Sequence, residues 1–175
     1  MKPSALTNKG NGILRVLQTT VGVSLPVVSA VDKKKIVVEN FNGIWDTGAT
    51  SSVITKKVVK KLNLRPVGMT LVHTASGSGN QNQYLVNIVL PCKVMIQNVK
   101  VTEGILFGTD ILIGMDIINL GDFSITNHGG ITVMSYCMPS YHSLDFVPEI
   151  NNGSFSKPDK KRLEREIKKV IETRV

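Results

Sequence analysis

One acid in this 175-residue chain stands where an apolar, strand-like run meets a turn of small residues. Asp46 follows Ile44-Trp45 directly and precedes Thr47-Gly48-Ala49-Thr50. A carboxylate at the edge of a core needs hydrogen-bond donors, because burying a charge without them is costly. The backbone N–H groups and the two hydroxyls of the turn could supply them. Asp46 is therefore the first candidate for acid–base chemistry, although an Asp-Thr-Gly triplet alone also occurs in ordinary turns.

The other groups that could carry catalysis lack a comparable setting. Asp110 and Asp116 flank a second apolar run, and Asp116 is expected to cap or brace the start of a helix. The serines at 76 and 78 lack the strand–turn–helix context of a nucleophile elbow. The histidines, His73, His128 and His142, have no metal-ligand spacing. The cysteines, Cys92 and Cys137, also lack it and are expected to be reduced structural thiols. No metal site and no cofactor is predicted.

Short runs of Val, Ile and Thr favour β structure for most of the chain. The strand leading to Asp46 should begin at Ile36, with a turn or bulge at Asn42-Gly43. A short helix is expected over Lys56–Asn63 after an N-cap at Thr55, with its lysines on a solvated face. The remaining strands are expected at Ile13–Val23, Ser51–Ile54, Met69–Ala75, Tyr84–Leu90, Cys92–Ile96, Val99–Glu103, Ile111–Gly114, Phe123–Thr126 and Ile131–Tyr136.

Two glycine-containing segments bear on the candidate site. Residues 76–83, Ser-Gly-Ser-Gly-Asn-Gln-Asn-Gln, should form the long flexible tip of a hairpin. The apolar run that ends at Gly114 should turn into one or two helical turns, which Gly121 ends. The hairpin tip is either a plain surface turn or a mobile flap.

The ends of the chain differ from its centre in composition. Residues 1–12 are polar and predict a flexible arm. Residues 139–153 should be irregular, and a basic amphipathic helix should follow from Ser156, with an apolar stripe that includes Leu163 and Ile167. The net charge is +8, and residues 153–175 supply half of it, with 8 Lys+Arg against 4 Asp+Glu. A nucleic-acid or membrane role would have to come from this tail, and we favour packing of its stripe on the body or on a second copy.

No targeting signal stands out in the sequence. No run reaches the roughly 18 apolar residues of a membrane span. The apolar stretch Val21–Val31 is short and is interrupted by Ser24 and Pro26, so it is a poor signal peptide. We expect a cytoplasmic protein without a transmembrane segment, and secretion stays open.

Three patterns together resemble the retropepsin-like aspartic proteases in their bacterial or phage-borne single-domain form. They are Ile44–Thr50, the Ser76–Asn80 hairpin tip, and Ile111-Leu112-Ile113-Gly114. The resemblance covers roughly residues 13–136. It implies an all-β acid-protease fold, a closed β-barrel with a flap hairpin, one or two short helices and a C-terminal helical extension. The implied domains are a flexible arm at 1–12, a protease domain at 13–138 and an extension at 139–175.

The resemblance also implies a role for each residue of the site. Asp46 would be the catalytic residue, and Thr47 would reach across a dimer axis to the partner's backbone. Gly48 would offer its N–H, and Ala49, where pepsin-like relatives have a hydroxyl residue, fits the dimeric retroviral pattern. Thr50 and Gly114 would support the site, with Gly114 beneath the turn. The flap would consist of Ala75, Ser76, Gly77, Ser78 and Gly79.

A single Asp-Thr-Gly raises the question of how the chemistry is completed. Peptide hydrolysis needs a base to activate water and an acid to protonate the carbonyl oxygen. Two carboxylates about 3 Å apart share one proton and can fill both roles. A homodimer that pairs two copies of Asp46 is the economical solution, acting on a peptide or protein substrate. The alternatives are a non-catalytic peptide-binding module of the same fold and a protein that acts through its basic tail.

Overall fold

The computed structural model describes residues 2–26, 36–74 and 77–151 of the chain. Its elements are β1 Ser4–Lys9, β2 Gln18–Ser24, β3 Glu39–Trp45, β4 Val53–Ile54, α1 Lys56–Lys61, β5 Gly68–Thr74, β6 Gly77–Val89, β7 Met95–Glu103, β8 Ile111–Ile113, α2 Met115–Ile118, β9 Asp122–Thr126, the 3-10 turn His128–Gly130, β10 Val133–Met138 and α3 Phe146–Asn151.

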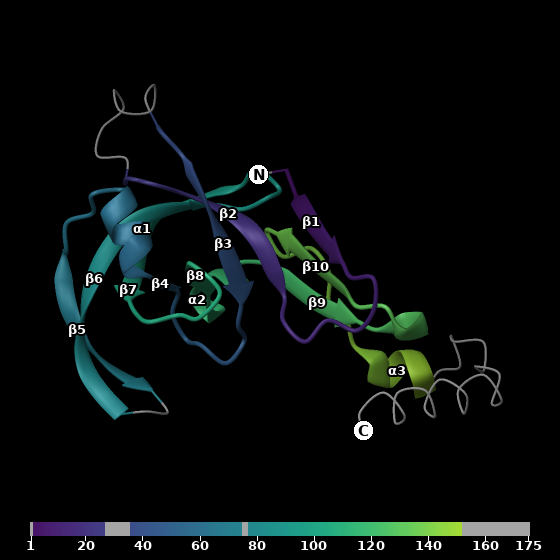
Figure 1. Ribbon diagram of the computed structural model, residues 1–175. Helices are drawn as coiled ribbons and strands as arrows, with labels where there is room; N and C mark the ends of the chain where they lie inside the picture. The colour runs from purple at the N-terminus through teal and green to yellow at the C-terminus, as the bar shows by residue number, and fades with distance from the viewer. Residues whose placement is uncertain (1, 27–35, 75–76, 152–175) are drawn as a thin grey trace.

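Six strands close into a barrel, in the order β2-β3-β8-β4-β7-β6, because β2 pairs with both β3 and β6 (Figure 1). Inward-facing β-branched residues fill it, and Val21, Ile88 and Ile113 have no exposed surface. Among the described strands, β5 pairs only with β6, and the hairpin that β5 and β6 form projects beyond the barrel. The all-β, closed-barrel prediction is confirmed.

A three-stranded sheet, β1-β10-β9, lies beside the barrel (Figure 1). The prediction that residues 1–12 form a flexible arm is wrong for residues 4–9. These residues form β1, which pairs antiparallel with β10 from Ser4↔Met138 to Lys9↔Val133. Only Leu6 of this strand enters the core, so an edge strand with one buried side chain looks like a polar arm in the sequence.

Two further predictions about strands need correction. β2 begins at Gln18, because the chain before it bends around Thr132, whose Oγ1 accepts the N–H of Leu14. Asn42 and Gly43 lie inside β3 in unbroken register with β2. A Cβ on Gly43 would come within 2.5 Å of Val21 Cγ2, so packing and not a turn calls for glycine there.

The two strands expected at 92–96 and 99–103 are one strand, β7. Its ladder with β6 shifts register between Val86 and Ile88, opposite Asn98, which has φ 56°. The buried Asn87 side chain accepts the backbone N–H of Asn98 and so holds this bulge. The turn signal at residues 97–98 therefore marks a bulge within one strand.

The hairpin of β5 and β6, which we call the flap hairpin, has far more pairing than expected. Its ladder runs from Gly68↔Gln83 to Thr74↔Gly77, so residues 77–83 form strand and not a long flexible tip. These polar residues are mostly exposed, which hides the strand from a hydrophobicity pattern. Residues 75 and 76 lie outside the described part of the chain.

The remaining predicted elements appear close to their expected bounds. They are α1 with Thr55 as N-cap, β8 followed by α2, and the β9–β10 hairpin. α3 forms within the stretch expected to be irregular, and the predicted amphipathic helix lies in residues 152–175, outside the described residues. No helix in the described ranges is long and apolar enough to cross a membrane.

Candidate active site

Asp46 is the first residue after β3, and its backbone is fixed by the neighbouring parallel strand β8. Its N–H donates to the Ile113 carbonyl oxygen at 3.0 Å, which continues the pairing of Trp45 with Ile113. Further along, the N–H of Met115 donates to the Ala49 carbonyl oxygen at 2.8 Å. The segment 46–52, which we call the Asp46 loop, is therefore tied to the barrel at both ends of its turn.

Asp46 is partly exposed, and Thr47 and Gly48 after it are exposed. The Asp46 Oδ1 accepts the N–H of Gly48 at 2.8 Å, a turn closed by the side chain itself. The hydroxyls of Thr47 and Thr50, both on exposed residues, make no hydrogen bond to any described group. The expected backbone donor is present, and the expected hydroxyl donors do not reach the acid.

Gly114 supports the Asp46 loop from beneath by close contact. A Cβ at this position would lie 2.7 Å from the Ser51 carbonyl carbon, 2.8 Å from its oxygen and 3.0 Å from the Ala49 carbonyl oxygen. These three atoms belong to the backbone, so they cannot move away from an added Cβ as the end of a flexible side chain could. The sequence prediction that Gly114 packs under the turn describes this arrangement, and its contribution to catalysis stays a prediction.

A second support under the loop comes from Ser52 and Asp116. Ser52 is fully buried; its N–H and its hydroxyl donate to the two carboxylate oxygens of Asp116, at 3.0 and 2.8 Å. The Ser52 Oγ in turn accepts the N–H of Gly114 at 3.1 Å. Asp116 therefore braces the loop and the start of α2 together. Sequence reasoning identified Asp116 but missed Ser52, whose burial has no local signal.

Trp45 links the site to the three-stranded sheet. It is buried, stacks on Phe123 with ring centroids 5.7 Å apart, and contacts Tyr136 at 5.1 Å. Its indole N–H donates to Thr19 Oγ1 at 2.9 Å. The prediction that Trp45 belongs to the core is confirmed, and Thr19 is a partner that the sequence did not reveal.

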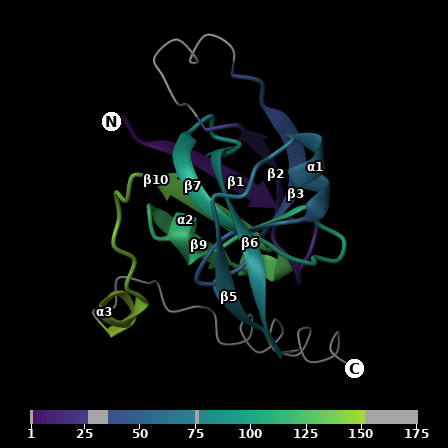
Figure 2. The same ribbon diagram turned by 90° about the vertical axis from the view of Figure 1, so that its left-hand side faces the viewer.

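The flap hairpin extends to the same end of the molecule as the turn that follows β3 (Figures 1 and 2). Gly77, Ser78 and Gly79 begin β6, at the far end of the hairpin, while Ala75 and Ser76 lie outside the described residues. At its base, the Tyr84 hydroxyl donates to Glu103 at 2.7 Å. Burial and this carboxylate raise the pKa of Tyr84. The structure thus puts a two-stranded projection at the end of the barrel that carries Asp46.

Residues 34–119 match the family model described as gag-polyprotein putative aspartyl protease. This range includes the Asp46 loop, the flap hairpin and Gly114. Just under half of the chain therefore resembles this aspartyl protease family.

Two solved protease structures are similar to this chain. A retropepsin-like aspartic protease from Rickettsia conorii gives a TM-score of 0.44 at 17% identity, covering 79% of this chain and 98% of that one. EIAV protease complexed with the inhibitor HBY-793 gives 0.45 at 19% identity, covering 60% and 86%. No curated protein matches the chain.

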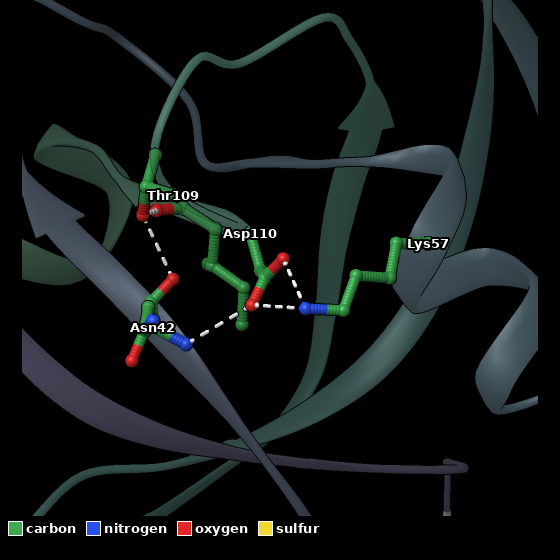
Figure 3. A network of polar contacts seen from close by, with 5 residues as sticks. Asn42, Lys57, Thr109 and Asp110 are labelled. Carbon is green, nitrogen blue, oxygen red and sulfur yellow. Dashed lines mark hydrogen bonds and ion pairs between the residues drawn. The ribbon is translucent and has the colours of Figure 1, made fainter.

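Asp110, which the sequence offered as another candidate acid, belongs to a network of polar contacts in the barrel (Figure 3). Its carboxylate accepts Lys57 Nζ at 2.9 and 3.1 Å and the Asn42 N–H at 3.3 Å. The neighbouring Thr109 hydroxyl donates to the Asn42 carbonyl oxygen at 2.8 Å. The network ties α1 to β3 and to the start of β8, so Asp110 positions barrel elements.

The structure thus separates the candidate residues into three groups. Asp46, Gly48, Ala49 and Gly114 lie together through direct contacts. Thr47 and Thr50 lie on the exposed side of the same loop. Gly77, Ser78 and Gly79 lie at the start of β6, on the flap hairpin.

Proposed function

We propose that this retropepsin-like protein is an aspartic endopeptidase that acts as a homodimer, with one Asp46 from each chain. The observation that carries the proposal is the Asp46 loop itself. It is tied to the barrel by Ile113, Gly114 and Asp116 from beneath, while Asp46 itself stays partly exposed. The match to an aspartyl protease family supports the same conclusion.

The proposed reaction uses the two carboxylates with one shared proton. The ionised carboxylate takes a proton from water as the water oxygen adds to the peptide carbonyl carbon. The protonated carboxyl group gives its proton to the carbonyl oxygen. The carbon–nitrogen bond then breaks as the nitrogen receives a proton, which leaves an acid and an amine. The flap hairpin would cover the substrate and exclude water during these steps.

Asp46→Asn tests this function directly. We expect the variant to fold, because the amide oxygen can still accept the Gly48 N–H, and to lose peptide cleavage, because an amide cannot exchange the proton. Cleavage of fluorescent casein between about pH 4 and pH 7 measures the effect, with inhibition by a statine-type peptide as a second readout. Asp110→Asn is the matched control, since it removes an equivalent charge from a structural network.

Two results would separate the alternatives. Cleavage by Asp46→Asn at the wild-type rate would refute the catalytic assignment. Peptide binding by a wild-type protein that never cleaves would favour a non-catalytic binding module of the same fold.

A further inference from the structure

A run of exposed apolar side chains follows the three-stranded sheet. Tyr141, Leu144, Phe146, Val147 and Ile150 are each between 51% and 68% exposed. Several large apolar side chains exposed in one short segment are typical of an interaction site in soluble domains. We call residues 141–151, which include α3, the clasp.

The clasp is attached to the body at a defined point. The carboxylate of Asp122, the first residue of β9, accepts the Ser140 hydroxyl and the N–H groups of Tyr141 and His142, at 2.5, 2.6 and 2.7 Å. Farther along, Asp145 Oδ1 accepts the Val147 N–H at 2.9 Å at the start of α3. The clasp therefore projects from one fixed place with its apolar residues uncovered.

The position of α3 indicates what covers it. In both views α3, the turn after β3 and the end of the flap hairpin lie toward the lower end of the molecule (Figures 1 and 2). Two Asp46 carboxylates can meet only if a second copy approaches this end. A clasp on the same side extends toward the space that the second copy would occupy.

Charge favours the same occupant. The clasp contains two acids, Asp145 and Glu149, and no Lys or Arg, so its formal charge is −2. The rest of the chain carries 21 Lys+Arg against the other 11 acids, a charge of +10. Two such bodies repel each other, and an acidic clasp offsets this repulsion where it meets the partner. An anionic membrane or a nucleic acid would repel the clasp instead.

We propose that the clasp docks on a second copy of this chain and stabilises the dimer, with Phe146, Val147 and Ile150 buried against the partner. This inference rests on the proposed two-chain function, since that function brings the second copy to the face where the clasp lies. Apolar anchors at the centre of an interface commonly carry most of its affinity. The contact would make the population of active dimers depend on residues far from Asp46 in the sequence.

The dimer dissociation constant of the full-length chain tests the proposal. We expect the double variant Phe146→Asp, Val147→Asp to raise this constant at least about 30-fold in sedimentation equilibrium, the size of a hot-spot effect. Val37→Asp is the matched control, because Val37 is 69% exposed next to the start of β3, and it should leave the constant unchanged. Circular dichroism and thermal unfolding verify that both variants fold.

A cross-linking experiment identifies the occupant. A photoreactive phenylalanine analogue at position 146 is introduced into an equal mixture of ¹⁴N- and ¹⁵N-labelled full-length chains. Cross-links between a light and a heavy chain support docking on the partner. Cross-links found only within one chain, or an unchanged dissociation constant in the double variant, would overturn the clasp proposal.

The failure of the proposed function gives a different result. A wild-type chain that cleaves casein while it is monomeric by sedimentation would remove the two-chain active site and the clasp with it. A dimer that cleaves casein normally but ignores the double variant would remove the clasp alone.

Discussion

The substitution Gly114→Ala tests how much the close contact beneath the Asp46 loop contributes to stability and activity. Gly114 has φ −94° and ψ −173°, an extended conformation that alanine adopts without strain, so the substitution acts through contact alone. The added Cβ would lie 2.7 Å from the Ser51 carbonyl carbon, whereas ordinary contacts begin at 3.4 Å. The loop would therefore have to move by the difference, 0.7 Å.

Two effects of different size follow from this displacement. Overpacking in a close-packed region costs about 1–3 kcal/mol, so the free energy of unfolding should fall by that amount. A misplacement approaching 1 Å at a catalytic group reduces the rate by roughly 10- to 100-fold. Activity should therefore fall by more than the loss of folded protein explains, because most molecules stay folded.

The assay pairs urea unfolding with casein cleavage at a protein concentration where the proposed dimer is saturated. Gly12→Ala is the matched control: a Cβ there meets no atom within 4 Å, so stability should stay within about 0.5 kcal/mol and activity should not change. If Gly114→Ala matches Gly12→Ala in both measurements, the contact argument is wrong. If stability falls and the rate per folded dimer does not, Gly114 supports the fold without positioning Asp46.

Two other predictions concern the three-stranded sheet. Tyr136→Phe should lower the free energy of unfolding by about 1 kcal/mol, because it removes the 2.9 Å hydrogen bond from the buried hydroxyl to the Ile117 carbonyl oxygen; Tyr141→Phe, on an exposed residue, should not. Burial raises the pKa of Tyr136 from 10.0 to about 12. The wild type should therefore lose stability, relative to Tyr136→Phe, as pH rises from 10 to 12. Parallel plots of the free energy of unfolding against pH for the two proteins would contradict this. The hydroxyl of Ser140 and then the N–H groups of Tyr141 and His142 hold the pKa of Asp122 below 3.8, so the root of the clasp should stay intact above this pH and release as pH falls below it. Amide shifts of Tyr141 and His142 in an NMR titration would follow the release, and a midpoint at or above 3.8 would count against the anchor.

The sequence was most informative where chemistry and packing call for the same residue types. The family resemblance implied that Gly114 lies beneath the turn at Asp46, and in the structure Gly114 lies close to Ala49 and Ser51 of that loop. The flap hairpin was located from its glycines but given too long a tip, since exposed strands carry no hydrophobic alternation. β1 was missed for a similar reason, with Leu6 as its one buried residue.

Hydrogen-bond partners that meet only through tertiary contacts could not be predicted from the sequence. Ser52 and Thr19 are small polar residues in segments with no local signal, and each becomes important only through a group far away in the chain. Ser52 meets Asp116 across 64 positions, and Thr19 meets Trp45 across 26. A single sequence shows which residues could form hydrogen bonds, but only the fold shows which pairs do.

The supports of the Asp46 loop all come from its barrel side. Ile113, Gly114, Met115 and Asp116 hold its backbone, whereas Thr47, Gly48 and Thr50 are exposed on the other side. The barrel holds the backbone of the loop, and the hydrogen bond to the Asp46 carboxylate comes from Gly48 on the exposed side. Under the proposed mechanism the barrel fixes the geometry of each half-site, while the contact between copies fixes how many complete sites exist. The two contributions are separable: Gly114→Ala should lower the rate of a saturated dimer, and the clasp variants should lower only the concentration of dimer.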